Sequence, residues 1–239
     1  MTKPRLSIIV FAYDEAENVQ PVLRELRAYL GQHHPETQLV FVDDGSRDGT
    51  SAQATAALSG SGAVLLRHEH NRGIGAALKT GIRHCQADWV TFLPADGQIP
   101  PSAISTLLGA AADGEVDLVF SNYQARDDGA HRTLLSWGVR VLILALHGVQ
   151  LRCEGPYLFR RALFQPEVLR PDSFFLNFEF PIRMLTEGKR VRSVEIPCRK
   201  RQHGSSKSTG LTRILGVARD LVDFRVRRLR ERPSRGWRT

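Results

Sequence analysis

The sequence predicts an α/β fold with a mostly parallel, doubly wound sheet that carries helices on both faces. Short apolar runs alternate with segments whose apolar residues recur at helical spacing, and this alternation continues over roughly the first half of the chain. The apolar runs are continuous, which is typical of parallel strands buried on both faces. A chain of 239 residues is long enough to bury a substantial core around such a sheet.

The composition indicates a basic globular protein. Hydrophobic residues make up 42% of the chain and charged residues 24%, which excludes a disordered polypeptide. The formal net charge of +8 favours a phosphate-rich partner such as a nucleotide, nucleic acid or anionic membrane. Cys85, Cys153 and Cys198 lack metal-like spacing, so we expect small core residues in a reducing compartment. We expect neither a signal peptide nor a membrane-spanning segment.

The first two predicted strands are each followed by acidic residues. Residues 5–11 form the first strand, and Asp14 is the expected cap of the helix after it. Residues 38–42 form the second, and Asp43 and Asp44 come directly after it. Ligands of open α/β sheets lie at the carboxyl ends of the strands. We therefore expect one acid to terminate the strand and the other to contact a ligand.

A glycine loop precedes the helix that follows the third predicted strand, residues 63–67. Gly73 and Gly75 lead into a helix over residues 76–85 and form half of the dinucleotide fingerprint G-x-G-x-x-G. Leu78 stands in place of the third glycine, which argues against a dinucleotide site. The N-terminus of this helix is still expected to be able to meet a phosphate.

The fourth predicted strand, residues 89–93, is followed by the polar residues at the centre of the expected site. Asp96 and Gln98 follow it, and Pro100 and Pro101 close the turn. A carboxylate and an amide at a strand end suit a hard divalent cation, which prefers oxygen ligands. Both residues equally suit a turn in which they bond the backbone. The residues alone leave these two interpretations open.

A helix over residues 101–112 and a strand over residues 116–121 continue the alternation. The chain resembles glycosyltransferase family 2 over residues 5–210. Four segments carry the resemblance, in this order: LSIIVFAYDEAENV, FVDDGSRDGT, HNRGIGAALKTGI and TFLPADGQIPPSAI. Within that family, the sequence is most similar to dolichyl-phosphate mannose synthases and bacterial polyprenyl-phosphate glycosyltransferases. The resemblance implies a GT-A fold, which is a nucleotide-sugar-binding α/β sandwich.

The resemblance also implies a donor site. It implies that Tyr13, Glu15 and Asp43 line the nucleotide base and ribose, with Asp44 nearby. These residues follow the first two predicted strands, at the edge where ligands are expected.

A metal on the donor diphosphate, Mg²⁺ or Mn²⁺, is implied as well. By resemblance Asp96 binds it and Gln98 supports it. The synthases usually read Asp-Ala-Asp-x-Gln here, whereas Pro94 stands in place of the first aspartate. We therefore expect weak metal affinity, with water and diphosphate oxygens completing the coordination shell.

The composition changes at residue 130, where a long apolar helix is expected. Arg132 and Ser136 are four residues apart and share one face of it. A helix that is apolar nearly all round is typical of a core, and an interfacial helix is the alternative. The resemblance implies that this helix lies against the membrane and that Arg132 and Ser136 meet the acceptor phosphate.

Two further segments complete the expected acceptor side. Residues 174–180 are rich in phenylalanine, and Glu179 is the only acid among them. Glu179 is either a base that deprotonates a hydroxyl acceptor, as in other family members, or a helix-start residue within aromatic packing. Residues 190–197 alternate in polarity and predict an edge strand.

A cationic loop at residues 199–207 resembles the R-x-x-G-x-S-K loop of the synthases. The resemblance implies that Arg201 and Lys207 hold the donor diphosphate, alone or shared with the acceptor, and that Ser206 lies on the acceptor side. Without the resemblance, the spacing suits a solvated basic loop.

The C-terminal segment predicts an amphipathic helix over residues 211–229, followed by a basic tail. Cations near an anionic leaflet each contribute about 1 kcal/mol, so this segment suits a membrane surface. The sequence carries no RRM, KH or helix-turn-helix motif, and we expect no nucleic-acid partner.

These observations predict residues 1–210 as a GT-A catalytic domain and residues 211–239 as an amphipathic helix with a basic tail. Residues 1–121 are the expected donor half and residues 122–210 the acceptor half. The expected activity is inverting transfer of a sugar from a nucleotide-diphosphate sugar to a polyprenyl phosphate. We expect it peripherally, at the cytoplasmic face of the membrane.

The residues expected to carry the chemistry are Asp96, Arg132 and Lys207. One alternative is a family member that acts on a hydroxyl acceptor with Glu179 as base. Another is a nucleotide-sugar-binding relative without activity.

Overall fold

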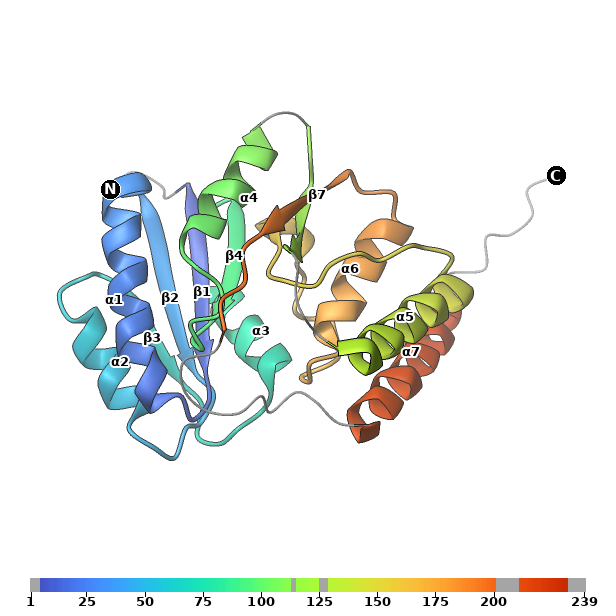
Figure 1. Ribbon diagram of the computed structural model, residues 1–239, viewed down its shortest axis with the longest axis horizontal. Coiled ribbons are helices and arrows are strands. Elements are labelled where there is room, and N and C mark those ends of the chain that lie inside the picture. Colours follow the sequence, from blue (N-terminus) through green and yellow to red (C-terminus); the bar gives the residue numbers. More distant parts are fainter. Residues whose placement is uncertain (1–4, 113–114, 125–128, 201–210, 232–239) are drawn as a thin grey trace.

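The structure is a computed structural model of the chain, with helices packed on both faces of a central sheet (Figure 1). It describes residues 5–112, 115–124, 129–200 and 211–231. At residues 129–136, 211–215 and 231 it describes the backbone only.

The sheet is mixed, with seven strands in the order β3-β2-β1-β4-β6-β5-β7. Neighbouring strands are parallel except where β6 pairs antiparallel with β4 and β5. The mostly parallel, doubly wound sheet is therefore confirmed, and β7 is an edge strand as predicted. The strands are β1 (Leu6–Ala12), β2 (Thr37–Asp43), β3 (Val64–Arg67), β4 (Trp89–Pro94), β5 (Leu118–Tyr123), β6 (Leu158–Arg160) and β7 (Val191–Ile196).

Helices cover both faces of the sheet, and on one side α5 and α7 lie beyond α6 (Figure 1). One apolar core lies between the sheet and α1, α2 and α4. The other lies between the sheet and α3 and α6, and it extends to α5 and α7, which pack side by side. The helices are α1 (Ala16–His33), α2 (Thr50–Leu58), α3 (Ile74–His84), α4 (Ser102–Ala112), α5 (Gly129–His147), α6 (Leu176–Thr186) and α7 (Leu211–Glu231), with a short 3₁₀ turn at Arg161–Leu163.

The continuous apolar runs are explained by the two cores. Along β1, Ile8 and Val10 face the first core, whereas Ile9 between them faces the second. All three side chains are almost completely buried. A strand that buries both faces needs apolar residues at successive positions, because side chains alternate between faces.

The first helix begins differently from the sequence prediction. Asp14 does not cap α1, which starts at Ala16 with Glu15 in the cap position and no side-chain hydrogen bond there. Asp14 instead has a positive φ of 50°, and its Oδ1 accepts a hydrogen bond from the Arg47 N–H at 2.8 Å. The carboxylate therefore joins the loop after β1 to the loop after β2.

Helix α5 is buried along one side only, and its location at an interface stays a prediction. Ile143 and His147 are buried in the second core, whereas Trp137, Val141 and Leu144 are exposed. The helix therefore packs along one side and presents apolar side chains on another. Among the described residues, no helix is long and apolar enough to cross a membrane.

Candidate functional site

The carboxyl ends of β1, β2 and β4 meet at one edge of the sheet. In the strand register Ala12 lies beside Asp43, and Phe11 lies beside Pro94. Backbone hydrogen bonds extend both pairings by one residue, because the Asp44 N–H donates to the Ala12 carbonyl at 2.9 Å and the Ala95 N–H donates to Phe11 at 3.0 Å. The polar residues after the three strands therefore emerge together.

Asp43 carries a buried carboxylate oxygen that lacks a donor. Its side chain is 1% exposed, and Oδ1 accepts a hydrogen bond from the Ser46 N–H at 2.9 Å. Oδ2 accepts no hydrogen bond from the described residues, although Arg67 Nε lies 3.5 Å away. Burying an unsatisfied carboxylate oxygen is costly, so such an oxygen at a strand end indicates a ligand position.

Asp44 is held by the protein itself. Its Oδ1 lies 2.7 Å from His68 Nδ1 and accepts the Arg72 N–H at 3.0 Å, and its Oδ2 accepts the Gly73 N–H at 2.8 Å. Of the two consecutive acids, Asp44 therefore terminates the strand. Asp43 keeps one buried oxygen that accepts no hydrogen bond from the described residues and pairs with Arg67, and its contact with a ligand stays a prediction.

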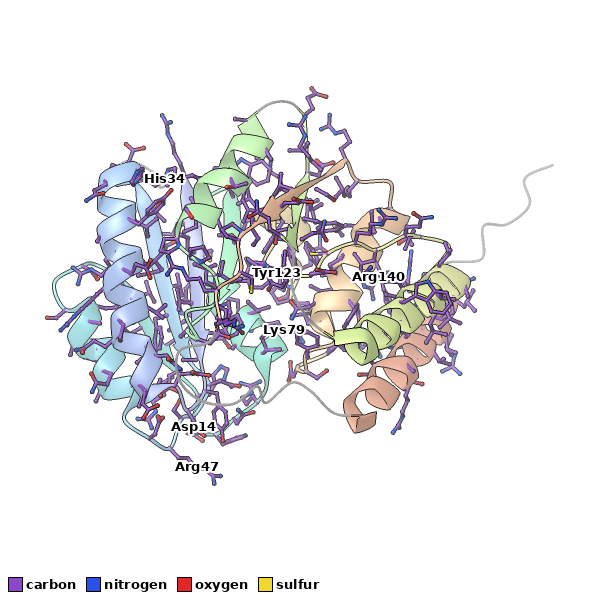
Figure 2. The ribbon with its side chains drawn as sticks, viewed as in Figure 1. Asp14, His34, Arg47, Lys79, Tyr123 and Arg140 are labelled. Carbon is purple, nitrogen blue, oxygen red and sulfur yellow. The ribbon has the colours of Figure 1, made fainter. Side chains whose placement is uncertain are left out.

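The loop after β1 is fixed by the turn that begins α2. The Asp14 N–H donates to Ser46 Oγ at 3.0 Å, and the Glu15 N–H donates to Thr50 Oγ1 at 2.8 Å. Glu15 Oε2 accepts a hydrogen bond from Asn18 at 2.7 Å. Figure 2 shows Asp14 and Arg47 at the same end of the sheet. Tyr13 and Glu15, both half-buried, are thereby placed at the edge that Asp43 occupies.

Asp96 follows β4 and is half-buried. Its Oδ1 accepts the Gln98 N–H at 3.0 Å, and Gly97 between them has a φ of 73°. The Gln98 carbonyl in turn accepts the Arg199 N–H at 2.8 Å, and Arg199 forms a two-pronged ion pair with Glu25. The turn interpretation is therefore correct for one carboxylate oxygen. The other accepts no hydrogen bond from the residues that the structure describes.

The oxygens at this loop fit Mg²⁺ or Mn²⁺. The described residues contain no cluster of three histidine, cysteine or acidic side chains that would form a protein-only metal centre. Asp96 offers one carboxylate oxygen, and Gln98 offers an amide oxygen two residues away. Pro94 lies within β4 beside Phe11 and offers no side-chain ligand. A cation held by so few protein oxygens must complete its shell with water and ligand oxygens.

The glycine loop before α3 packs against the loop before α6. The Ala76 N–H donates to the Asp172 carbonyl at 3.1 Å. A Cβ on Gly73 would lie 2.5 Å from that carbonyl oxygen, and a Cβ on Gly75 would lie 2.6 Å from the Pro171 oxygen. Lys79 Nζ also bonds Asp172 Oδ1 at 2.9 Å. The glycines therefore admit a second stretch of the chain, and one N–H group of the helix N-terminus is occupied by it; phosphate binding at this helix stays a prediction.

The sequence from residue 7 to residue 172 matches the family described as Glycosyl transferase family 2. The chain belongs to glycosyltransferase family 2.

Curated relatives and solved structures support this assignment. Undecaprenyl-phosphate 4-deoxy-4-formamido-L-arabinose transferases from Pseudomonas fluorescens (strain SBW25) and Pseudomonas aeruginosa (strain LESB58) are each 31% identical over 225 residues. Those matches cover 91% of this chain but only 63% and 64% of the relatives, so the chain spans less than two thirds of their length.

The fold is that of glucosyl-3-phosphoglycerate synthase from Mycobacterium tuberculosis. Its complex with Mn²⁺, uridine-diphosphate-glucose and phosphoglyceric acid has a TM-score of 0.71 at 21% identity, covering 97% of this chain and 82% of that one. The predicted GT-A fold is thereby confirmed.

Within this glycosyltransferase, the donor residues predicted from the sequence lie at one edge of the sheet. They follow three adjacent parallel strands, β2, β1 and β4, and their roles stay predictions. The residues are Tyr13, Glu15, Asp43, Asp44, Asp96 and Gln98.

The acceptor residues lie mostly outside the described part of the chain. Arg132 and Ser136 belong to α5, where only the backbone is described. Arg201, Ser206 and Lys207 lie outside the described residues altogether. Their predicted roles therefore stay predictions.

Glu179 lies in the first turn of α6 and is 0% exposed. Its Oε1 accepts a hydrogen bond from Arg183 Nε at 3.1 Å and lies 3.0 Å from Arg183 Nη2, and its Oε2 accepts a hydrogen bond from Arg227 at 3.0 Å. The carboxylate is therefore an internal ion-pair partner that joins α6 to α7. It does not face a space that an acceptor hydroxyl can enter.

Two residues that matter for the site were missed from the sequence. His68 contacts Asp44, and Arg140 forms an ion pair with Glu154. The Glu154 N–H donates to the Ser121 carbonyl at 2.9 Å, which places Glu154 beside the carboxyl end of β5. The ion pair between Arg140 and Glu154 therefore connects α5 to this loop. Neither pairing follows a local spacing rule, because the partners come from different elements.

Proposed function

We propose that this glycosyltransferase transfers a sugar, with inversion, from a nucleotide-diphosphate sugar to a polyprenyl phosphate at a membrane surface. Residues 1–121 hold the donor, residues 122–210 hold the acceptor, and residues 211–239 contact the membrane. The curated relatives named above are undecaprenyl-phosphate transferases, which supports a lipid-phosphate acceptor. The observation that carries the choice of acceptor is the fully paired, buried carboxylate of Glu179.

The donor occupies the edge formed by β2, β1 and β4. The buried, unsatisfied Oδ2 of Asp43 accepts a hydrogen bond from the base or ribose, and Tyr13 and Glu15 line the same part of the donor. Asp96, supported by Gln98, holds Mg²⁺ or Mn²⁺ on the diphosphate. When bound, that cation offsets the negative charge that develops on the leaving diphosphate.

The acceptor needs no general base in this mechanism. A hydroxyl must lose a proton to become a good nucleophile, whereas a lipid monophosphate is already anionic at neutral pH. Glu179 is the acid that the sequence offered as a base, and its two oxygens are bonded to Arg183 and Arg227. An anionic acceptor instead requires cations that hold it in line with the anomeric carbon.

Helix α5 supplies one of these cations, Arg132, together with Ser136. By helical spacing, Arg132 and Ser136 occupy the same face of α5 as Arg140. Arg140 pairs with Glu154 beside the carboxyl end of β5, which supports that face of the helix as the one nearest the site. Arg132 and Ser136 bind the acceptor phosphate. Arg201 and Lys207 bind the donor diphosphate, and Ser206 completes the acceptor side.

Replacing Arg132 with alanine is expected to lower kcat/KM with a polyprenyl phosphate by about 10²-fold or more, the scale for losing one aimed donor. Lys207→Ala is expected to have a similar effect. The measurement is turnover over a panel of nucleotide-diphosphate sugars, with and without the lipid phosphate. Arg152→Ala, which removes an exposed arginine from the loop after α5, is the control. Equal turnover on a soluble hydroxyl acceptor without lipid would replace this proposal with the hydroxyl-acceptor alternative.

The membrane surface is formed by two helices that lie side by side, α5 and α7 (Figure 1). Each presents apolar side chains that recur at helical spacing. They are Trp137, Val141 and Leu144 on α5 and Val222, Val226 and Leu229 on α7. Arg219 and Arg230 are also exposed on α7. Apolar side chains beside cations suit peripheral attachment to an anionic leaflet, here the cytoplasmic face of the membrane.

Val226→Glu is expected to weaken partitioning onto anionic vesicles about tenfold, because one buried apolar side chain contributes on that scale. Wild-type binding is expected to fall as salt rises. Cosedimentation with anionic and neutral vesicles at several salt concentrations measures both effects. Leu65→Glu is the control, because Leu65 and Val226 are equally exposed, at 41%, and Leu65 lies on the distant edge strand β3. Equal loss of binding in both variants would exclude α7 as the membrane surface.

A further inference from the structure

A buried histidine connects the acidic turn after β2 to helix α3. His68 follows β3 directly and is 8% exposed. Its Nδ1 lies 2.7 Å from Asp44 Oδ1, and its Nε2 lies 2.9 Å from Thr80 Oγ1. A carboxylate can only accept a hydrogen bond, so Nδ1 carries a proton and donates it to Asp44. When the ring is neutral, Nε2 then accepts a hydrogen bond from the Thr80 hydroxyl.

Further hydrogen bonds join the end of β3 to the acidic turn after β2, residues 43–46. The His68 N–H donates to the Asp43 carbonyl at 2.9 Å, and an Arg67 guanidinium N–H donates to the Ser46 carbonyl at 3.1 Å. Gly45 has a φ of 75°, and a Cβ there would lie only 2.3 Å from the His70 carbonyl carbon. The turn therefore rests directly on the backbone that follows β3.

This arrangement fixes the backbone that carries the Asp43 carboxylate, whose Oδ2 lies beside Arg67. Asp43 and Asp44 are consecutive, so a rotation of the backbone at Asp44 also moves Asp43. Three donors hold the Asp44 carboxylate, and two of them are backbone N–H groups of Arg72 and Gly73. His68 provides the only side-chain donor among these three. Losing it leaves a buried carboxylate oxygen short of one charge-assisted hydrogen bond.

We propose that His68 is a positioning residue of the donor site, which orients Asp44 and thereby the adjacent carboxylate of Asp43, to which the proposed function assigns a donor contact. It acts through Asp44 rather than on the substrate, because both of its ring nitrogens are bonded within the protein. The inference rests on the proposed donor site. It assigns the histidine to donor affinity rather than to the chemical step.

The test compares three substitutions at His68 with one at Thr80. His68→Leu removes both side-chain bonds, whereas His68→Asn places an amide N–H where Nδ1 stands and keeps the bond to Asp44. His68→Gln places its amide near the position of Nε2 instead. Thr80→Val removes only the bond on the far side of the ring. The measurements are the Kd of a panel of nucleotide diphosphates by calorimetry with Mg²⁺ or Mn²⁺, the donor KM and kcat, and the melting temperature.

We expect His68→Leu to raise both the nucleotide Kd and the donor KM by about tenfold or more, the equivalent of about 1.4 kcal/mol. At saturating donor, kcat should stay within about threefold of wild type, since the reacting groups are unchanged. His68→Asn should recover most of the affinity, and Thr80→Val should change it little. If His68→Leu does not fold, tighter binding by His68→Asn than by His68→Gln gives the same support.

Two results would overturn the proposal. If His68→Leu binds nucleotide diphosphates as tightly as wild type does, under conditions where both proteins are folded, the positioning role is wrong and the proposed function is unaffected. Equal losses in the asparagine and glutamine variants, in step with their melting temperatures, would show a purely structural role. A wild-type protein that binds none of the nucleotide diphosphates would instead contradict the proposed function, and this inference with it.

Discussion

Replacing Asp96 with alanine is expected to lower turnover by about 10³-fold or more, because a metal that stabilises the leaving diphosphate contributes several kcal/mol. The fold should survive. Asp96 is half-buried, and among the described residues its carboxylate accepts one hydrogen bond, from the Gln98 N–H at 3.0 Å. Losing that bond should reduce stability by only about 1 kcal/mol. Asp96→Ala is therefore expected to lose most of its turnover while its stability changes little.

The measurement is turnover as a function of Mg²⁺ and Mn²⁺ concentration, alongside thermal melting. Pro94→Asp provides a gain-of-function counterpart, because it adds a second carboxylate at the end of β4. It is expected to lower the metal concentration for half-maximal activity by about tenfold. Glu36→Ala is the control, since Glu36 is exposed and pairs with Arg5 at the opposite edge of the sheet. Full activity of Asp96→Ala in excess chelator would exclude a metal role for this residue.

The sheet was predictable because its signal is local. Runs such as residues 5–11 and 38–42 are mostly apolar, and each observed strand except β6 begins and ends within about two residues of its prediction. Strand β6 was not anticipated as an antiparallel member of the sheet. It contains only three residues, and its pairing with β4 and β5 depends on partners distant in the chain.

The glycine loop shows where local reasoning fails. Gly73 precedes α3 and Gly75 lies in its first turn, as in loops that bind phosphate, and the same pattern serves any close approach of backbone. The groups that approach are the carbonyls of Pro171 and Asp172, which lie in the loop before α6, far along the chain. Nothing near the glycines identifies that partner.

The two acids after β2 were predicted to divide into one scaffold residue and one ligand residue. The sequence could not say which was which, because both are aspartates at adjacent positions. The assignment depends on His68 and on the N–H groups of Arg72 and Gly73, which surround Asp44 and leave Asp43 Oδ2 without a donor. The turn at Asp96 is similar, since it serves a structural hydrogen bond and a predicted metal ligand at once.

Glu179 is expected to contribute strongly to the stability of the fold. Glu179→Ala is expected to lower the free energy of unfolding by about 3–5 kcal/mol, the scale for removing one partner of a buried ion pair. The substitution leaves Arg183 and Arg227 facing each other in the core without a carboxylate between them. Arg227 already has one buried guanidinium nitrogen without an acceptor among the described residues. Denaturant unfolding measures the loss.

Glu179→Gln separates this structural role from general-base catalysis. The amide keeps the side-chain volume and one acceptor oxygen but removes the charge, so we expect a smaller loss of stability and near-normal kcat in the folded protein. Asp223→Ala on α7 is the matched control, because it breaks an exposed ion pair with Arg219 and should change stability by less than about 1 kcal/mol. A base would give the opposite pattern, with unchanged unfolding and kcat reduced by about 10²-fold or more. That outcome would favour the hydroxyl-acceptor alternative, because an anionic lipid phosphate needs no general base.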